Sequence, residues 1–255
     1  RSRSDSIENV VRQAKQLGKN GVQEIVLTGV NLGDFGKGVE ATKTDEDFYA
    51  LIQQLDAVEG IERFRISSIE PNLLSANIIQ FVAQSKKFMP HFHIPLQSGS
   101  NYVLGLMRRR YKRELYAERV ALLKSLMPHC AIGVDVIVGF PSESDTHFQE
   151  TFDFLHELDV SYLHVFTYSE RDNTRALEIK PVVPVGVRHE RNKALRNLSF
   201  LKMQHFTEQH RGQTRKVLFE GHQKNGLMEG YTDNYLRIST PYRPEWANRI
   251  IDWTV

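Results

Sequence analysis

"VDVIVGFPSESDTHFQET", residues 134–151, is the stretch that decides the fold. An apolar run ends at Gly139, Phe140 and Pro141, a Ser/Glu-rich turn follows, and the next residues have the composition of a helix. A strand that leads through a short turn into a helix is the repeating unit of α/β folds with parallel strands. Asp135 lies inside the apolar run, where an unpaired carboxylate costs free energy. Two interpretations of Asp135 follow: a buried structural hydrogen-bonder, or a polar group that faces a ligand.

The first 180 residues repeat this strand–helix unit. Helical spacing or composition occurs at residues 5–19, 45–58, 73–84, 101–127 and 145–158. Strand-like runs occur at residues 22–30, 63–71, 91–100, 131–138 and 162–168, and the run at 63–71 alternates polar and apolar residues. Such alternation of strands and helices predicts parallel strands with helices over the outside face. The chain opens on a helix and without Met, so we expect a partial (βα)6 barrel that lacks its first strand.

The pattern changes from about residue 181. Residues 181–210 read as a Pro-containing connector followed by a long polar helix at 188–210. Residues 211–255, here called the C-terminal module, contain short β segments separated by turns such as "HQKNG" and "DN". The expected division is therefore a partial barrel at 1–180, a connector and helix at 181–210, and a small all-β module at 211–255, which is too small for confident independent stability.

Composition places the chain among ordinary globular proteins. Of its 255 residues, 40% are hydrophobic and 25% are charged, and no apolar run approaches the roughly 18 residues of a membrane span. Cys130 is the only cysteine, which excludes a disulfide framework and a cysteine-rich metal site within this chain. We expect Cys130 to be a small core residue and the protein to be cytoplasmic.

Positive charge is unevenly distributed although the formal net charge is only +2. Five cations fall within six residues, at Arg108, Arg109, Arg110, Lys112 and Arg113. A solvated helix face is the simpler interpretation of such a cluster. Contact with a phosphate backbone is the alternative, because several Lys and Arg side chains on one surface attract nucleic acid.

The ends of the five expected strands carry small and polar residues: "TGVNLGDFG", "SSIEP", "LQSGS", "GFPSES" and "TYSERDNT". Functional groups of parallel α/β barrels gather at these ends, where glycines let a ligand approach the backbone. The same segments contain no His/Glu metal cluster, no phosphate loop and no nucleophile with an evident base. His91 and His93 share one strand face and are interpreted as packing groups. The barrel is thus expected to bind a ligand without supplying its own reactive group.

Five ordered blocks carry a resemblance to a known family. "TGVNLGDFG", "RISSIEP", "HIPLQSGSNYVLGLMRRRY", "DVIVGFPSE" and "FTYSERDNTRA" resemble, in order, blocks of the radical S-adenosylmethionine (SAM) tRNA methylthiotransferases. "HIPLQSGS" with "MRRRY" is most similar to the branch acting on N6-threonylcarbamoyladenosine at position 37 of tRNA. The isopentenyladenosine branch is second, and the ribosomal-protein branch is a poorer match. "GYTDNYLRI" resembles the TRAM module, which holds RNA in this family.

The resemblance implies SAM and two [4Fe–4S] clusters in the intact enzyme. Family members hold one cluster with three cysteines of an N-terminal domain and the other with a CxxxCxxC loop, and no cluster ligand or catalytic residue is expected in this chain. The resemblance therefore implies an inactive fragment lacking both parts. We expect the edge of the strand at 22–30 to be capped by residues 1–6 or paired with another chain, and any dimer to be a consequence of truncation.

The resemblance also implies roles for individual residues. The residues expected to bind SAM are Gly29, Val30, Asn31, Ser67, Ser68, Glu70, Gln97, Ser98, Asp135, Gly139, Phe140 and Pro141. Those expected to contact the RNA substrate are Arg108, Arg109, Arg110, Ser169, Arg171, Thr174, Arg211, Lys216 and Arg237. Asn173 stands where the family has Gly, and Asn tolerates positive φ better than most residues.

The expected function is methylthiolation of C2 of N6-threonylcarbamoyladenosine-37, with the tRNA anticodon loop as partner and no membrane partner. A methylthiotransferase acting on isopentenyladenosine-37 is one alternative, and a passive RNA-binding module without chemistry is another. A cofactor-free barrel lyase is disfavoured, because it needs a Lys or His at a strand end, and none is convincing there.

Overall fold

The computed structural model describes residues 4–37 and 46–255. The first part of the chain contains the elements α1 (Ile7–Lys19), β1 (Glu24–Leu27), η1 (Leu32–Asp34), α2 (Phe48–Asp56), β2 (Arg63–Ile66), α3 (Ala76–Gln84), β3 (Phe88–Gln97), α4 (Asn101–Leu106), α5 (Arg113–Leu126), β4 (Ala131–Val138), α6 (Asp145–Glu157) and β5 (Tyr162–Thr167). The second part contains η2 (Arg175–Glu178), α7 (Val185–His210), β6 (Thr214–Lys224), β7 (Leu227–Thr232), β8 (Arg237–Pro241), η3 (Pro244–Trp246) and β9 (Ile250–Thr254). Within the described ranges, no helix is both long and apolar enough to cross a bilayer.

Local chemistry explains where several helices begin. The side chains of Ser6, Asp47 and Ser75 each accept a hydrogen bond from a backbone N–H of the first turn of α1, α2 and α3. Ser144 starts α6 with a reciprocal pair of bonds, in which the imidazole of His147 accepts from the backbone N–H of Ser144. The reciprocal bonds of Ser144 and His147 fix the start of α6 in the turn that follows β4.

Five strands form one parallel sheet in the order β1-β2-β3-β4-β5, which confirms the predicted count and alternation. β1 lies at an edge and, among the described residues, pairs with β2 alone. Of the segment expected to cap that edge, residues 1–3 lie outside the described residues. Ser4 contacts the loop after η1 and not the edge of β1: its Oγ accepts a hydrogen bond from the backbone N–H of Gly36.

The two faces of this sheet differ in chemistry. Alternate residues such as Phe64, Phe92, Ile94 and Val136 are buried and join one apolar core with the helices. The opposite face carries Arg65, His91, His93, Asp135 and Tyr162, with His164 exposed beside them. The sheet is thus apolar toward the helices and polar toward the barrel interior.

The strand predicted within 63–71 is present as β2, but its alternation of polar and apolar residues does not appear as alternating burial. All four residues of β2 are buried, including Arg63 at 3% and Arg65 at 2% exposure. The C-terminal module covers both arginines, as shown below. The helical region predicted at 101–127 is also not continuous. It is divided into α4 and α5 around Arg108, which has a φ of 57°.

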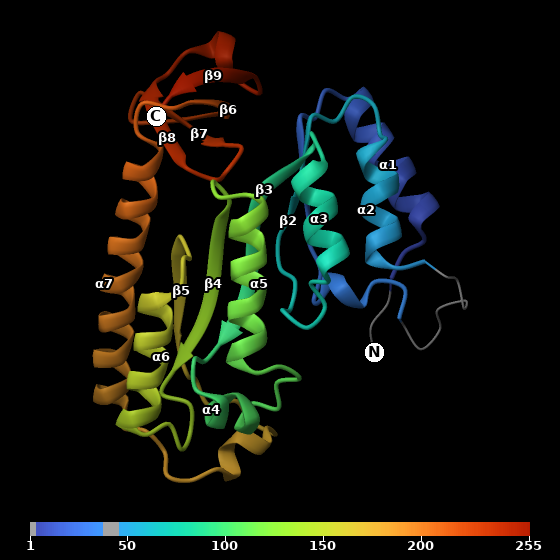
Figure 1. Ribbon diagram of the computed structural model, residues 1–255. Coiled ribbons are helices and arrows are strands. Elements are labelled where there is room, and N and C mark those ends of the chain that lie inside the picture. The colour runs from blue at the N-terminus through green and yellow to red at the C-terminus, as the bar shows by residue number, and fades with distance from the viewer. Residues whose placement is uncertain (1–3, 38–45) are drawn as a thin grey trace.

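The C-terminal module forms an antiparallel sheet in the order β8-β7-β6-β9. Its own small core contains Val217, Phe219 and Met228. Figure 1 shows the module, in red, beyond the end of the barrel at which β3 and β4 begin, joined to the rest of the chain by α7. We call this the start end of the barrel, and the opposite end, where the five strands finish, the exit end.

Five side chains attach the module to the start end. Arg63 donates to the carbonyl oxygens of Lys216 (2.7 Å) and Tyr231 (3.2 Å). Arg65 donates to those of Thr232 (2.7 Å) and Asp233 (2.9 Å). The amides of Asn234 and Asn248 donate to the carbonyls of His129 and Gly21, and the ring of Tyr235 stacks on His91 at 4.0 Å. The module is therefore held at one fixed position by directional bonds.

Candidate functional site

Polar residues from different strand ends meet at the exit end. Glu70 follows β2, and its carboxylate accepts a hydrogen bond of 2.9 Å from the guanidinium of Arg109 in the segment after α4. Both side chains are about one quarter exposed, so neither is withdrawn from solvent. Arg108, Arg110, Asp34 and Asn72 line the same cavity, of about 210 Å³. The structure thus brings together Glu70, expected to bind SAM, and the arginine cluster, expected to contact RNA.

The residues after β1 line a second cavity, of about 330 Å³, beside the first. Gly29, Val30 and Asn31 face the space between the end of β1 and the helices α1 and α2. Val30 is fully exposed, and the side-chain amide of Asn31 donates to the carboxylate of Asp34 at 3.0 Å. Asp34 lines both cavities and therefore links these residues to the Glu70–Arg109 pair.

Several buried polar atoms at the exit end have no hydrogen-bond partner within the described residues. They are Asn31 Oδ1, Asn72 Oδ1, Arg109 Nε and the hydroxyl of Tyr168, which follows β5. A buried polar atom without a partner is destabilising by about 1–3 kcal/mol, so such groups point to a missing partner. Two hydrogen-bond acceptors and one donor therefore adjoin the 210 and 330 Å³ cavities. A polar ligand with amino, hydroxyl and carboxylate groups would satisfy all three.

Asp135 is half-buried on the polar face of the sheet. Its Oδ1 lies 2.8 Å from Nε2 of His93 on the neighbouring strand, and both side chains are 19% exposed. The ring of His164 approaches that of His93 edge-on at 5.3 Å. His93 and His164 line an interior cavity of about 350 Å³. Asp135 therefore has the structural hydrogen bond of the first interpretation, and it is His93, its partner, that lines the cavity.

His91 has a different environment on the same strand. It is 6% exposed, its Nε2 lies 2.7 Å from the hydroxyl of Tyr162, and its ring stacks on Tyr235. Burial, with the positive charge of Arg65 nearby, holds the pKa of His91 well below its ordinary value. His91 fits the predicted packing role, whereas His93 is joined to a candidate site residue.

The segment after β4 is held in place by buried charges. Gly139 has a φ of 75°, and its N–H donates to Oε1 of Glu143 at 2.8 Å. The same carboxylate pairs with Arg191 of α7 at 2.7 Å, and both side chains are buried. Burial raises the pKa of Glu143 above its ordinary value. A Cβ atom on Gly139 would lie 2.3 Å from Cγ of Arg188, so only glycine fits here.

Phe140 and Pro141 follow Gly139 and are buried. The ring of Phe140 contacts that of Tyr168 edge-on at 5.3 Å, which closes the wall between the ends of β4 and β5. Gln97 has a φ of 71° and is 9% exposed at the end of β3. Ser98 is fully buried, with its hydroxyl 3.2 Å from that of Thr151 on α6. In this position Ser98 stabilises the turn after β3.

The remaining candidates lie on the surface at both ends. Ser169, Arg171 and Thr174 are exposed at the exit end, and Asn173 between them has a φ of 62°, as expected for an Asn in place of Gly. Arg211, Lys216 and Arg237 are exposed on the C-terminal module at the start end. The structure therefore separates the residues expected to contact RNA into two groups at opposite ends of the barrel.

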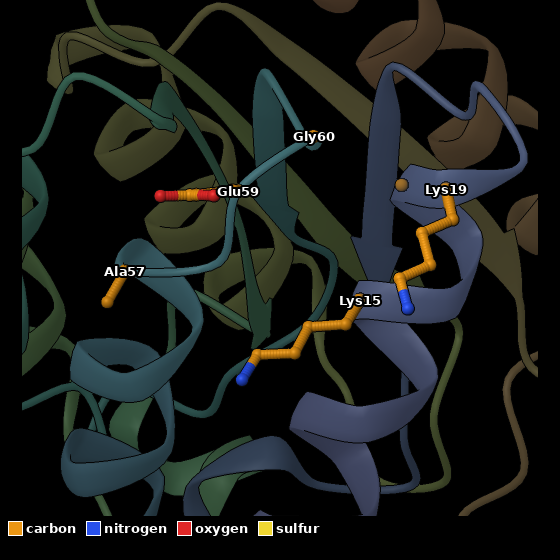
Figure 2. Close-up of a pocket in the computed structure, with 6 residues that line it drawn as sticks. Lys15, Lys19, Ala57, Glu59 and Gly60 are labelled. Atoms are coloured by element: carbon orange, nitrogen blue, oxygen red, sulfur yellow. The ribbon is translucent and has the colours of Figure 1, made fainter.

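A cavity of about 570 Å³ lies away from these groups, between the end of α1 and the loop before β2. Figure 2 shows that Lys15, Lys19, Ala57 and Glu59 surround it and that no residue of a strand end lines it. Gly18 and Gly60 touch beneath it, since a Cβ on Gly18 would lie 3.1 Å from the carbonyl carbon of Gly60. This hollow therefore lies where two chain turns approach each other closely.

Cys130 does not fit an iron–sulfur cluster. It is fully buried immediately before β4, at the start end, and burial raises the pKa of its thiol to about 12. Cluster iron is held by several thiolates, and this chain has one cysteine. Within the described residues, no group of three or more His, Cys, Asp or Glu side chains could hold a metal ion. The described residues therefore supply no site for a cluster.

The sequence reading missed several residues of this region. Asn72, His164, Glu143, Arg188 and Arg191 gained no role from the sequence, although the alternation of polar residues at 91–93 and 162–164 was a signal for one shared strand face. The pairing of Arg191 with Glu143 joins residues 48 positions apart, and no local pattern announces it.

Comparisons with known proteins identify the family of the chain. The radical SAM superfamily matches residues 1–155. Threonylcarbamoyladenosine tRNA methylthiotransferase MtaB of Bacillus subtilis is 39% identical over 241 residues, which cover 92% of this chain and 52% of that protein. MtaB of Aquifex aeolicus is 40% identical over 238 residues, covering 92% of this chain and 55% of that protein. The tRNA-2-methylthio-N(6)-dimethylallyladenosine synthase of Pelotomaculum thermopropionicum is 36% identical over 226 residues, covering 89% and 50%.

The chain thus spans about half the length of these curated relatives. Among solved structures, coproporphyrinogen III oxidase (HemN) from Escherichia coli has a TM-score of 0.53 at 14% identity, covering 78% of this chain and 46% of that chain. The radical SAM methyltransferase TsrM from Kitasatospora setae has a TM-score of 0.51 at 12% identity, covering 64% and 31%. These two show a shared fold alone. The resemblance predicted from the five sequence blocks is confirmed.

Proposed function

The chain belongs to the radical SAM superfamily, and from this premise we propose that it provides the barrel and RNA-binding parts of a tRNA methylthiotransferase acting on N6-threonylcarbamoyladenosine at position 37. The two MtaB relatives are threonylcarbamoyladenosine tRNA methylthiotransferases, which supports this substrate. Superfamily membership implies SAM and a [4Fe–4S] cluster. A second cluster, and cluster ligands outside this chain, are part of the proposal.

The observation that carries the proposal is the set of unpartnered polar atoms at the exit end. Asn31 Oδ1, Asn72 Oδ1 and Arg109 Nε adjoin the cavities beside Glu70. SAM, when bound, would supply the methyl and adenosyl groups of the reaction. Ser67, Ser68 and Glu70 would hold its ribose or amino group, and Phe140 and Pro141 would pack beside its adenine.

The RNA contacts in this proposal come from two places. Arg108, Arg110, Ser169, Arg171 and Thr174 surround the exit end, where the reacting nucleoside must lie. The C-terminal module, with the boundaries 211–255, would hold the RNA elsewhere, which assigns residues 1–180 to the barrel and 181–210 to the connection. A tRNA substrate would also place the protein in the cytoplasm.

A second candidate substrate has a specific observation in its favour. Two tRNA-2-methylthio-N(6)-dimethylallyladenosine synthases are 36% and 31% identical to this chain. Their identities are lower than the 39% and 40% of the first two MtaB relatives, so threonylcarbamoyladenosine is proposed first.

The proposal is tested by measuring SAM binding to the purified chain by isothermal titration calorimetry. We expect wild type to bind SAM and Asp135→Asn to bind it about 10-fold more weakly, because a hydrogen bond to a charged group contributes about 1.5–3 kcal/mol. Asp153→Asn, an exposed carboxylate on the outer face of α6, is the matched control and should bind as wild type does.

Fluorescence anisotropy with tRNA carrying threonylcarbamoyladenosine, isopentenyladenosine or unmodified adenosine at position 37 distinguishes the substrates. The proposal predicts tightest binding of the first. Binding of tRNA without any binding of SAM would contradict it and would favour a passive RNA-binding module.

A further inference from the structure

The two groups of residues proposed to contact RNA are separated by the length of the barrel. Arg108, Arg109 and Arg110 lie at the exit end, and Lys216 lies on the module at the start end. β4 runs between the two ends with eight residues, which corresponds to about 26 Å of extended chain. An RNA molecule that contacts both ends must therefore span the barrel, and the nucleotides at the start end are remote from the reacting one.

A cleft of about 500 Å³ lies at the start end, between the barrel and the module. Three exposed cations line it: Lys86 in the turn before β3, Lys216 on β6 and Arg249 before β9. In the part of the chain that the structure describes, none of the three forms an ion pair. Their charges are therefore available to an anionic ligand.

The carboxylates of the cleft do not cancel this charge. Asp233 is bound by Arg215 through two hydrogen bonds of 2.8 Å, so its charge is already compensated. Glu62 is the second carboxylate lining the cleft. Three free cations against one free carboxylate leave an excess of two positive charges.

Arg211 and Arg237, the other module cations predicted to contact RNA, are differently placed. Arg211 pairs with Glu208 on the preceding helix, and Arg237 pairs with Glu229 across the sheet. These exposed pairs are weak, but each arginine already has an anionic neighbour. The cleft therefore offers the stronger net attraction for a phosphate group.

The walls of the cleft are fixed before any ligand arrives. Arg63 lies at its base and donates to the carbonyls of Lys216 and Tyr231, and Arg65 holds Thr232 and Asp233. These bonds keep Lys86 of the barrel and the two module cations on opposite sides of one space. A preformed site loses less conformational entropy on binding than a flexible one.

We propose that this cleft binds the phosphate backbone of an RNA stem that is remote from the reacting nucleoside. The cleft presents Lys and Arg side chains, whose charges bind phosphate groups and do not distinguish one base from another. The inference rests on the proposed function and specifies it: the substrate must offer a helical stem long enough to reach from the exit end to the start end.

The test compares two RNA hairpins that share one anticodon loop and differ in having a long or a short stem. Wild type should bind the long-stem hairpin more tightly. The variant Lys86→Gln/Lys216→Gln/Arg249→Gln should lose at least about 10-fold in affinity for it and show a shallower dependence on salt by about two to three phosphate contacts. Its affinity for the short-stem hairpin should not change.

Arg211→Gln/Arg237→Gln is the matched control and should change the long-stem affinity less than the cleft variant does. All five substituted side chains are exposed, and thermal melting verifies that each variant folds. If the cleft variant keeps the affinity and salt dependence of wild type for the long stem, the cleft proposal is wrong and the proposed function stands. If wild type binds neither hairpin, both are wrong.

Discussion

The start end and the exit end of the same sheet differ in how far the polar side chains of β2 and the segment after it are buried and hydrogen-bonded. In β2, Arg63 and Arg65 at the start end are buried, and each donates to two backbone carbonyls of the C-terminal module. A few residues later, Ser67 and Ser68 at the exit end are half-buried, and Asn72 keeps an unpartnered buried oxygen within the described residues. The two buried arginines at the start end are committed to the fold, whereas these residues at the exit end remain available to a ligand.

This difference separates two kinds of substitution. A change of a buried arginine at the start end should lower the free energy of unfolding, because it leaves buried carbonyls or charges without partners. A change at the exit end should lower ligand affinity with little effect on stability. The predictions below are ordered by the size of the effect expected.

Arg65→Met should have the largest effect. Arg65 is 2% exposed and also donates to Glu24 at 2.9 Å, so its removal leaves a carboxylate and two carbonyls unsatisfied. We expect the free energy of unfolding in urea to fall by about 3–5 kcal/mol. Arg171→Met, on an exposed arginine at the exit end, should change it by less than about 0.5 kcal/mol. Equal effects for the two variants would remove the contrast between the ends.

Arg191→Met tests an exception at the exit end. Arg191 and Glu143 form a buried pair that holds the N–H of Gly139 in the segment after β4. We expect a loss of about 2–4 kcal/mol in urea unfolding, part of which Glu143→Gln should restore in the double variant, because the unpaired buried charge is then gone. Additive effects of the two substitutions would show that the pair does not couple.

His91 should make stability depend on pH. Its pKa is lowered in the folded protein by burial, so below the ordinary His pKa of about 6.5 the unfolded chain binds a proton that the folded chain does not. Stability should therefore fall as pH falls below about 6.5, by at most about 1.4 kcal/mol per pH unit for this residue.

His91→Gln should reduce that pH slope of the free energy of unfolding, measured in urea between acidic and neutral pH. His129, His164 and His210 have pKa values lowered by burial too, so a smaller slope should remain. An unchanged slope would show that His91 titrates normally in the folded state.

Ser68→Ala should have the smallest effect on stability, less than about 0.5 kcal/mol, because Ser68 is half-buried at the exit end and its hydroxyl has no hydrogen bond within the described residues. SAM affinity measured by calorimetry should nevertheless fall roughly 2- to 10-fold, the value of one neutral hydrogen bond. A stability loss without an affinity loss would move Ser68 from the ligand site to the fold.

The local sequence pattern was sufficient to predict where most strands of the sheet lie, but not all of their boundaries. The predicted strand at 131–138 coincides with β4, because an apolar run buried among helices has few alternatives. β3 begins at Phe88 and not at residue 91 as predicted, and Pro90 is accommodated within the strand. The separation of α4 from α5 was also not predicted, and the residue with positive φ at this point is Arg108 and not the nearby Gly105.

The sequence predicted which segments form the candidate site, but not which of their side chains contact one another. The strand ends supplied Glu70 and Arg109 as separate candidates, and only the fold brings them to 2.9 Å. The long helix 188–210 looked polar, yet Arg188 and Arg191 within it are buried. A buried guanidinium requires partners from distant segments, and those partners are set by tertiary structure alone.

Hydrogen–deuterium exchange of the purified chain, with and without SAM, tests the central claim that the exit end is the ligand site. The account predicts slower exchange after SAM addition at the ends of β1, β2 and β4, around residues 29–34, 67–72 and 139–143. It predicts no change at residues 231–236, where the module binds the start end. Protection confined to residues 231–236, or no protection at saturating SAM, would contradict it.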